Sequence, residues 1–418
     1  MQKDEHGNTP QTVLISRRGA DRLRLGHVWV YRSDLIQADG ISPGALVTVQ
    51  DLRKKVLGAA LYSTASEIAV RMISSKPVEN LEYLVRERIR TAVAYRGRFV
   101  QNTNAYRVIF SEGDCLPGLI VDRYNDIVSV QALTQAMDAD PMRATVLSEL
   151  QATLSPTTIV ERVDPRVRRL EQLPEKDPAV IFSDAHNSAN QPAPSETEES
   201  AAPAGVKTTT EFHMNGVRFV FDALAGQKTG AFLDQRENYA AAAQYARGEA
   251  LDVFCYQGGF ALHLARTCEK VTGVDSSRPA LEVAEQNAAL NGSEIEWIEA
   301  NAFDLLRDYS DANHKYDCIV LDPPAFAKSR RELPTALRGY KELNLRALKM
   351  LRPGGILVTC SCSYHVSPAD LLDVLASAAQ DSHRIIRILE NRGQSKDHPS
   401  ILGIPETAYL KCVVAHVS

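Results

Sequence analysis

The sequence predicts an α/β protein whose carboxyl-terminal half forms a doubly wound parallel sheet, preceded by a small β-barrel and a small α+β unit. Three observations predict this. Short strands and turns fill residues 11–75, a helical stretch with short strands fills 77–182, and strands alternate with helices from residue 212 onward. We therefore divide the 418 residues into domains 1–76, 77–182 and 211–418, with a linker at 183–210.

Composition and charge exclude several classes of protein. The chain has 47 Lys and Arg against 52 Asp and Glu, a net charge of −5, which excludes a uniformly basic nucleic-acid coat but not a local basic face. No apolar run approaches the ~18 residues of a membrane span, and no apolar leader is visible. The seven cysteines contain no C-x-x-C pair. We expect reduced thiols, a cytoplasmic location and no metal site.

The predicted barrel has strands at 13–15, 45–50, 57–62 and 67–73, each bounded by turn residues. Arginines cluster near its start, and Trp29 is interleaved with them. A solvated charged face would have the same composition. The aromatic residue favours a surface that contacts RNA. The candidate contacts are Arg17, Arg18, Arg22 and Arg24.

The middle unit combines a helix at 81–100 and strands at 106–110 and 127–133, which flank a turn-rich segment at 111–124. A helix at 142–154 and a strand at 158–161 complete it. Residues 183–210 contain one branched aliphatic residue and no aromatic one. Such a segment cannot build a core, so we expect a disordered linker.

The carboxyl-terminal half repeats strand and helix. Strands are expected at 250–256, 271–275, 295–299, 318–321 and 355–360, with helices at 260–267, 279–291, 340–351 and 368–379. Repeated βα units build a parallel sheet, and its ligand binds at the carboxyl ends of the strands.

The first of these strands leads through the residues Asp-Val-Phe-Cys-Tyr-Gln into a pair of glycines. Glycines at a helix start let a ligand approach the backbone, although Gly-Gly is often simply a turn. The spacing does not match G-x-G-x-x-G, so no pyrophosphate site is indicated. The candidate ligand contacts in this turn are Asp252, Phe254, Tyr256 and Gly258.

Carboxylates end the next two strands. Asp275 lies 23 residues after Asp252, a spacing that suits a carboxylate accepting two ribose hydroxyls. Asp304 follows the third strand, where it could bond an adenine amino group. Both residues have a structural alternative as helix N-caps. Together they favour a nucleoside ligand.

The fourth strand ends in Asp322-Pro-Pro-Ala-Phe326. The prolines, Pro323 first, fix an extended and rigid turn. An aromatic ring such as that of Phe326 can stack on a planar base, and the Asp322 carboxylate can bond its polar edge. The alternative is a purely structural turn.

The fifth strand ends in Thr-Cys-Ser-Cys-Ser, which contains Cys360 and Cys362. Two residues apart on an extended segment, the thiols point the same way. A thiol beside a ligand is a candidate nucleophile if its pKa is lowered, whereas a buried inert cysteine is the alternative. His365 is near, but a zinc site needs more ligands.

These motifs resemble those of class I S-adenosylmethionine-dependent methyltransferases: residues 252–259, Asp275, Asp304 and 322–326. Three further stretches at 26–31, 112–122 and 226–236 extend the likeness over nearly the whole chain except 183–210. In this order the motifs resemble the RlmI-type 23S ribosomal RNA (cytosine-5)-methyltransferase family.

The resemblance implies a PUA domain, a middle α+β domain and a Rossmann-like methyltransferase domain. It implies S-adenosylmethionine as cofactor, large-subunit ribosomal RNA as substrate, and leaves a homodimer open. The 227–236 hairpin would close over the cofactor. The implied cofactor contacts are Asp252, Phe254, Tyr256, Gly258, Asp275, Asp304, Asp322, Phe232, Gln235 and Arg236.

The resemblance also implies a covalent mechanism. Addition of a thiolate to cytosine C6 makes C5 reactive. Cys362 is our choice of nucleophile and Cys360 the alternative, with Asp322 on the N3/N4 edge and Phe326 and Pro323 beside the base. Three other hypotheses stay open: methylation of an exocyclic amine of adenine or guanine without a thiol, a small-molecule methyltransferase, and a non-catalytic RNA-binding protein.

Overall fold

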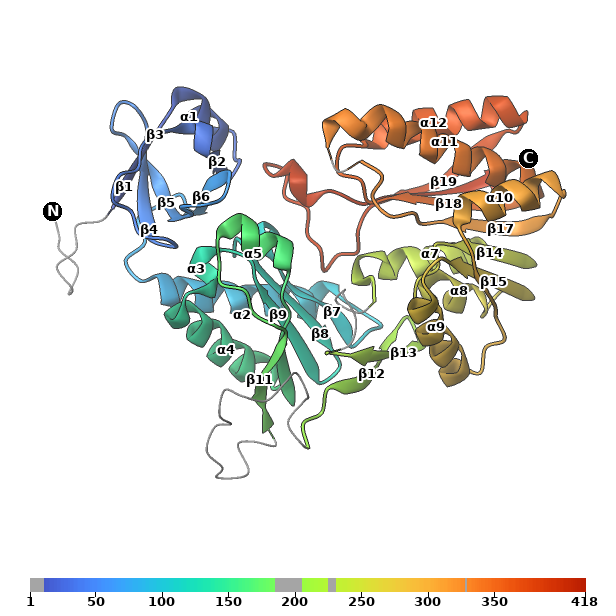
Figure 1. The fold of residues 1–418 in the computed structure, drawn as a ribbon, viewed down its shortest axis with the longest axis horizontal. Coiled ribbons are helices and arrows are strands. Elements are labelled where there is room, and N and C mark those ends of the chain that lie inside the picture. The colour runs from blue at the N-terminus through green and yellow to red at the C-terminus, as the bar shows by residue number, and fades with distance from the viewer. Residues whose placement is uncertain (1–10, 185–204, 225–230, 328) are drawn as a thin grey trace. The chain divides into compact units, whose positions relative to one another are not determined.

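The computed structural model describes residues 11–184, 205–224, 231–327 and 329–418, and their contacts divide them into two compact units (Figure 1). The first unit holds the described residues within Met1–Thr210, Asp222–Gly230 and Asp397–Thr407. The second holds those within Glu211–Phe221, Ala231–Lys396 and Ala408–Ser418. Each unit is described here by itself.

The first unit begins with one six-stranded sheet in the order β2-β6-β5-β4-β1-β3. The four predicted strands are confirmed as β1 (Thr12–Ile15), β4 (Leu46–Gln50), β5 (Val56–Tyr62) and β6 (Ile68–Ser74). The structure adds β2 (Trp29–Tyr31), β3 (Leu35–Gln37) and helix α1 (Arg17–Arg24). Helix α1 carries the predicted arginine cluster, and the Ser16 side chain caps it by accepting the Gly19 N–H.

A five-stranded sheet in the order β11-β10-β9-β8-β7 follows. Its elements are β7 (Ala105–Phe110), β8 (Leu119–Tyr124), β9 (Ile127–Ala132), β10 (Thr158–Glu161), β11 (Ala179–Ser183), α2 (Leu81–Phe99), α3 (Gln135–Asp138), α4 (Asp140–Leu154) and α5 (Pro165–Glu171). The prediction of a turn-rich segment at 111–124 was wrong from residue 119 onward, where the chain forms β8. Gly118, at φ +82°, ends the turn, after which the buried Leu119 and Val121 alternate as in a strand.

The two predicted amino-terminal domains form one unit, joined by a shared cluster of buried apolar side chains and by polar contacts. The Trp29 indole N–H donates to Glu112 at 2.9 Å. The Ser63 hydroxyl and the Arg71 guanidinium both bond the carboxylate of Glu171, at 2.7 and 3.0 Å. Glu171 is buried, so these charge-assisted bonds also satisfy a carboxylate that would otherwise be costly.

Residues 185–204 of the predicted linker lie outside the described residues. The linker is shorter at both ends than the predicted 183–210, because Ser183 belongs to β11 and Thr209 begins β12 (Thr209–Met214). Strand β12 pairs with β13 (Val217–Asp222) in a two-stranded sheet. Close to β12, the Lys207 ammonium forms an ion pair with Asp126 at 2.6 Å.

The second unit contains a seven-stranded sheet in the order β16-β15-β14-β17-β18-β20-β19. Its strands are β14 (Glu249–Val253), β15 (Lys270–Asp275), β16 (Glu296–Glu299), β17 (Tyr316–Leu321), β18 (Leu351–Ser361), β19 (Ile386–Arg392) and β20 (Lys411–Val417). The first five are parallel to one another, and β20 is antiparallel to both neighbours. The order reverses between β14 and β17, so a ligand site is expected there.

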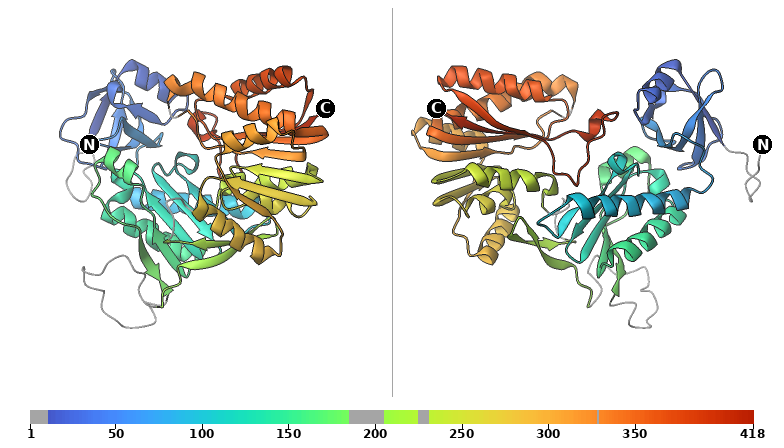
Figure 2. Two further views of the ribbon diagram at one scale, coloured as in Figure 1. Left: turned by 45° about the vertical axis from the view of Figure 1, so that its right-hand side comes forward. Right: turned by 180° about the vertical axis from the view of Figure 1, so that it is seen from behind.

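Helices cover both faces of this sheet (Figures 1 and 2). One face carries α7 (Arg236–Tyr245), α8 (Gly259–Leu264) and α9 (Arg278–Asn291), and the other carries α10 (Ala302–Asp311), α11 (Leu333–Met350) and α12 (Pro368–Ser382). Helices α7 and α10 and strands β19 and β20 were not predicted, and α11 begins seven residues before the predicted start at 340. The doubly wound arrangement itself is confirmed.

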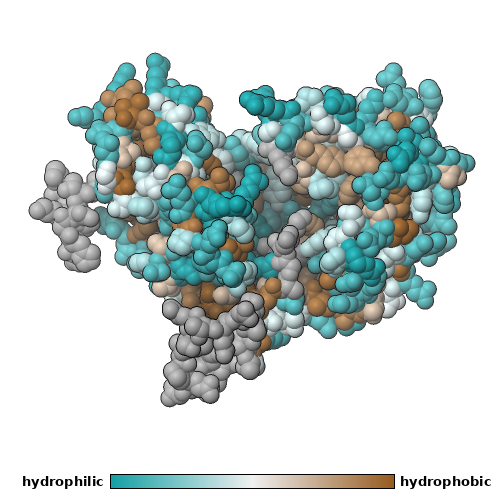
Figure 3. Space-filling view, viewed as in Figure 1, coloured by the Kyte–Doolittle hydropathy of each residue, from teal (hydrophilic) through white to brown (hydrophobic). Residues whose placement is uncertain are grey.

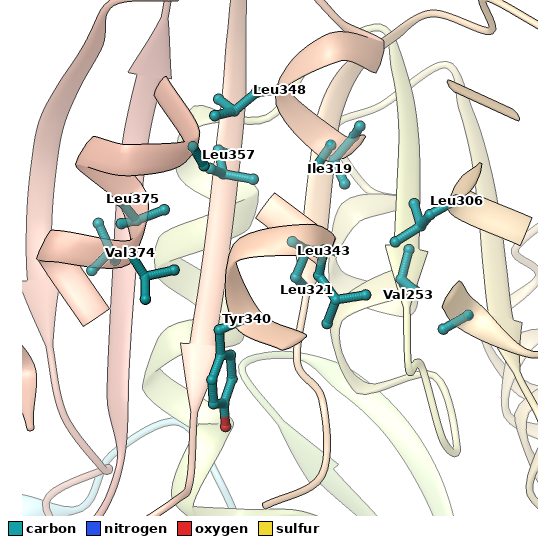
Figure 4. Close-up of a cluster of buried hydrophobic side chains, with 14 of the residues drawn as sticks. Val253, Leu306, Ile319, Leu321, Tyr340, Leu343, Leu348, Leu357, Val374 and Leu375 are labelled. Atoms are coloured by element: carbon teal, nitrogen blue, oxygen red, sulfur yellow. The ribbon is translucent and has the colours of Figure 1, made fainter. Parts of the chain in front are cut away.

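An apolar core lies between the sheet and helices α10 to α12 (Figure 4). Leu321 of β17, Leu357 of β18 and Leu343 of α11 are almost fully buried in it. Burying one such side chain stabilises the fold by about 1.5–3 kcal/mol. Outside the core the visible face of the molecule is largely hydrophilic (Figure 3). None of the described helices combines the length and the hydropathy needed to span a bilayer.

Candidate functional site

The turn between β14 and α8 has an unusual backbone. Phe254, Tyr256 and Gly258 have φ angles of 69°, 48° and 84°. Two of these are non-glycine residues in the left-handed region, where side chains cost energy and cluster at functional sites. The following residue, Gly259, starts α8 and packs against the buried ring of Tyr239. A Cβ added at Gly259 would lie 2.4 Å from Tyr239 Cζ, so only glycine fits there.

Replacing Gly259 with alanine is therefore expected to destabilise the second unit by about 1–3 kcal/mol, because the buried Tyr239 ring cannot move aside. Urea denaturation measures the change. The matched control is Gly97→Ala in α2, where an added Cβ meets nothing within 4 Å and stability should not fall. An unchanged midpoint for Gly259→Ala would contradict the packing described.

Asp275 connects the ends of β14 and β15. Its two carboxylate oxygens accept the backbone N–H groups of Tyr256 and Ser277, both at 2.9 Å. The carboxylate is thus fixed in orientation, and each oxygen keeps a lone pair for a further donor. The predicted carboxylate at this strand end is in a position to bind ligand hydroxyls.

Asp252 lies inside the fold. Its side chain is fully buried, one oxygen accepts the Ala261 N–H at 2.8 Å, and the other has no partner among the described residues. Burial, with the neighbouring charges of Asp322 and Asp275, raises the pKa of Asp252 to about 8. The residue supports the turn from within.

A cavity opens beside this turn, and its walls are mostly aromatic. The carboxylate of Asp322 also lines this cavity. Phe232 and Tyr256 face each other across 5.1 Å between ring centroids. The lining residues are Phe219, Ala231, Phe232, Tyr239, Phe254, Cys255, Tyr256, Gln257, Gly259, Phe260 and Asp322. Aromatic faces next to a carboxylate suit a ligand that carries a positive charge.

Asp304 lies on the first turn of α10 and is well exposed, with its carboxylate 2.8 Å from Arg307. The alternative prediction, that Asp304 caps the helix, is wrong. Asn301 is the N-cap and accepts the N–H groups of Phe303 and Asp304. The exposed oxygen atoms of Asp304 remain accessible to a ligand. Any contact with an adenine amino group stays a prediction.

The segment 226–236 is described only from residue 231, so residues 226–230 and the predicted hairpin closure lie outside the described residues. Phe232 lines the cavity. Gln235, buried in the short helix Leu233–Gln235, donates its side-chain amide to Asp322 at 2.9 Å. Arg236, which begins α7, is 1% exposed. Phe232, Gln235 and Arg236 were predicted to contact a cofactor. Of these, Gln235 positions the carboxylate of Asp322.

The end of β17 carries the Asp-Pro-Pro-Ala-Phe turn. Asp322 is partly exposed and Pro323 is buried. The Phe326 ring packs between those of Phe303 and Tyr340, at centroid distances of 5.9 and 4.8 Å. Phe326 is therefore partly a packing residue, and its remaining exposed surface is what stacking on a base would use.

Hydroxyl groups fix the end of β18 to that turn. The Ser363 hydroxyl accepts the N–H of Phe326 at 3.0 Å and that of Ala327 at 3.3 Å. The Tyr340 hydroxyl lies 3.0 Å from the hydroxyls of both Ser361 and Ser363. Sequence analysis missed Tyr340 and Ser363 as positioning residues, although Ser363 belongs to the Thr-Cys-Ser-Cys-Ser motif.

The two candidate thiols differ in access. Cys360 is completely buried within β18 opposite Cys412 of β20. Burial first, and then Cys412 and Asp322, raises its pKa far above the ordinary value. Cys362 follows the strand, is partly exposed, and its thiol donates to the Pro323 carbonyl at 3.9 Å. Cys362 is thus the thiol that a ligand beside Asp322 can reach.

The four predicted RNA-contacting arginines all lie on α1. Arg18 and Arg22 donate to the buried Asp34 at 2.7 and 2.8 Å, which attaches the helix to the sheet. Arg17 and Arg18 are the most exposed of the four, at 90% and 66% of their side chains. Arg24 pairs with two aspartates. Contact with RNA stays a prediction for all of them.

The described residues contain no group of three or more His, Cys, Asp or Glu side chains arranged to hold a metal ion.

The chain matches two family models: an S-adenosylmethionine-dependent methyltransferase over residues 137–409 and a PUA-like domain over residues 13–75.

Curated relatives match over nearly the full length. A ribosomal RNA large subunit methyltransferase I of Erwinia tasmaniensis is 34% identical over 416 residues, covering 96% of this chain and 98% of the relative. One of the same description from Tolumonas auensis is 35% identical over 415 residues, covering 96% and 98%.

Two solved structures share the fold. SMU.776, crystallised as a complex with SAH, superposes with a TM-score of 0.78 at 17% identity, covering 97% of this chain and 99% of that one. A second structure, of a protein from Streptococcus mutans, gives 0.77 with the same coverage. At this identity the likeness supports the fold alone.

Proposed function

The chain belongs to the ribosomal RNA large subunit methyltransferase I family of S-adenosylmethionine-dependent methyltransferases, and on this premise we propose that it methylates C5 of a cytosine in 23S ribosomal RNA. One observation carries the proposal: the partly exposed Cys362 thiol lies against the Asp322 turn, 3.9 Å from the Pro323 carbonyl. Methylation of an exocyclic amine needs no such thiol. Methylation of cytosine C5 by the covalent mechanism does.

The site fits the cofactor of the family. S-adenosylmethionine, when bound, supplies a methyl group on a positively charged sulfur. Aromatic walls and the Asp322 carboxylate stabilise such a charge, and the fixed Asp275 oxygens can accept ribose hydroxyls. The left-handed backbone at Phe254 and Tyr256 brings the β14–α8 turn to the cavity.

The side chains have separate roles in the proposed reaction. The Cys362 thiolate adds to C6, which makes C5 electron-rich. Once C5 carries the methyl group, water or Asp322 takes the C5 proton, the bond between sulfur and C6 breaks, and the C5–C6 double bond is restored. Asp322, oriented by Gln235, accepts a hydrogen bond from the N4 amino group on the N3/N4 edge and so orients the base for attack at C6. The exposed part of Phe326 stacks on the base. A base must leave its stack to enter such a site, so the target nucleotide is unpaired or flipped out.

Recognition of the RNA is assigned to the first unit. Its PUA-like sheet carries α1, and Arg17 and Arg18 extend from it into solvent. Ion pairs between these arginines and phosphates release counterions, so binding should weaken steeply with salt. These arginines do not distinguish one RNA sequence from another. Contacts with base edges must supply that specificity.

Asp275→Ala is expected to weaken binding of S-adenosylmethionine at least about tenfold, because two hydrogen bonds to a charged acceptor are lost. Isothermal titration calorimetry measures the affinity. Asp308→Ala is the matched control, because this α10 carboxylate is exposed and pairs only weakly with Arg307 at 3.5 Å. Equal affinities for the two variants would contradict the role given to Asp275.

The experiment that tests the function is transfer of a labelled methyl group to large-subunit ribosomal RNA from a strain that lacks this methyltransferase. The RNA is digested and its nucleosides are identified by mass spectrometry. Label in 5-methylcytidine supports the proposal. Label on a nitrogen of adenine or guanine overturns the C5 assignment and leaves the fold and the cofactor site as described.

A further inference from the structure

Lys411 is a buried lysine that is hydrogen-bonded to the segment carrying the proposed nucleophile. It is the first residue of β20, pairs with Ser361 of β18, and is 7% exposed. Its ammonium donates to the carbonyl of Ser363 at 2.6 Å and to that of Tyr409 at 2.8 Å. One of these carbonyls belongs to the residue that follows Cys362.

This ammonium is unusual because its hydrogen-bond partners are neutral. Among the described residues no carboxylate oxygen lies within 4 Å of its nitrogen, and a buried charge is costly unless it is paired. Burial lowers the pKa of Lys411 to about 8, although the neighbouring Cys362 and Asp370 oppose that effect. A buried ammonium held by neutral partners is costly, which makes Lys411 a candidate for a function.

The charges that face Cys362 are otherwise unfavourable for a thiolate. Burial first, and then the carboxylates of Asp322 and Asp234, raises the pKa of Cys362 to about 11, and Lys411 acts in the opposite direction. A nucleophilic thiol needs its thiolate, which a nearby ammonium stabilises.

Two further titratable groups face this pair. The Tyr340 hydroxyl bonds Ser361 and Ser363, and burial raises its pKa. The Asp370 carboxylate accepts hydrogen bonds from Ser367 in the capping box of α12, which lowers its pKa. Neither group changes charge between about pH 6 and 9. Asp252 does titrate in that range, but it is not among the charges that act on Cys362, whereas Lys411 is.

We propose that Lys411 is a positioning residue whose ammonium stabilises the thiolate of Cys362 while its hydrogen bonds hold the segment that carries the thiol. The inference rests on the proposed function and deepens it. The proton of the thiol passes to bulk water. The sulfur then keeps the electron pair that forms the bond to C6, and the ammonium remains protonated throughout.

Alkylation by iodoacetamide tests the pair without RNA or cofactor. The rate at Cys362 is followed by mass spectrometry of the peptide that contains it. Lys411→Met is expected to slow alkylation at pH 8 at least about tenfold, and Lys411→Arg, which keeps the charge, to stay within about threefold of the wild type. Lys349→Met, an exposed lysine on α11, is the matched control.

The wild-type protein gives a second readout. Below about pH 8 the rate should rise about tenfold per pH unit, and above it the rate should level off, because each further proton comes from Lys411 and removes the charge that stabilises the thiolate. Should Lys411→Met fail to fold by circular dichroism, this profile decides. A rate that keeps rising tenfold per unit to pH 10, or equal rates in folded Lys411→Met and wild type, overturns the inference.

The outcome is independent of the product. Label on a purine nitrogen would overturn the proposed function and leave the alkylation profile as it is. Label in 5-methylcytidine together with an alkylation rate that is indifferent to Lys411 would overturn this inference alone.

Discussion

Replacing Cys362 with serine is expected to lower methyl transfer to RNA by at least about 10³-fold, because a hydroxyl at this position is far less acidic than a thiol and cannot add to C6. Binding of S-adenosylmethionine should be unchanged, since Cys362 does not line the aromatic cavity. Turnover with saturating cofactor measures the first effect, and calorimetry the second.

Cys360→Ala is the matched control for this variant. Cys360 is fully buried, so its truncation should cost about 1–2 kcal/mol of stability and leave most of the turnover. The reverse pattern, an active Cys362→Ser and an inactive Cys360→Ala, would assign the nucleophile to the alternative thiol. Full activity in both variants would remove the covalent mechanism.

Asp322→Asn is expected to lower kcat by about 10²–10³-fold, because the isosteric amide loses the charge-assisted hydrogen bond that orients the base for attack. The loss should fall on kcat more than on the KM for RNA, since the substitution leaves the phosphate contacts that we propose for the first unit untouched. Steady-state kinetics with both substrates varied separates the two parameters.

Asp373→Asn on α12 is the control for this change, because Asp373 is exposed and lies outside the site. It should keep wild-type kinetics. An Asp322→Asn enzyme with a kcat within about threefold of the wild type would contradict the assigned role. A drop confined to KM would reduce Asp322 to a binding residue.

Much of the fold follows from local sequence patterns. Most strands of the parallel sheet are buried apolar runs, and buried strands of this kind carry a strong signal. The predicted strands ending at Asp275 and Leu321 agree with the structure to within two residues at each end. Helix α9 begins one residue before its predicted start, with Pro279 in its first turn.

The missed elements were missed for different reasons. Helix α10 has a clear amphipathic pattern, with Ala302, Leu305 and Leu306 on its buried side, so its sequence was sufficient to predict it. Strand β19 is largely exposed, so it lacks the apolar run that marks a buried strand. Strand β20 sits between two antiparallel neighbours, a topology that sequence spacing does not encode.

The site was predictable where one residue carries the chemistry. Asp275, Asp322 and Cys362 are all at strand ends as expected, and the parallel sheet brings such ends together. The resemblance placed Gln235 in the site, but its contact with Asp322 could not be predicted, and Lys411 could not be placed from the sequence at all. Each acts on a residue more than 45 positions away, and only tertiary packing brings them together.

The central claim is that C5 methylation proceeds through a bond between Cys362 and cytosine. The most direct test uses ribosomal RNA that contains 5-fluorocytidine, whose fluorine cannot leave as the C5 proton does, so that the covalent intermediate persists. Incubation with S-adenosylmethionine should give a protein–RNA adduct stable in denaturing gels. The adduct should map to Cys362, be absent in Cys362→Ser and form in Cys360→Ala. An active enzyme that gives no adduct, or one mapped to another residue, would contradict the account.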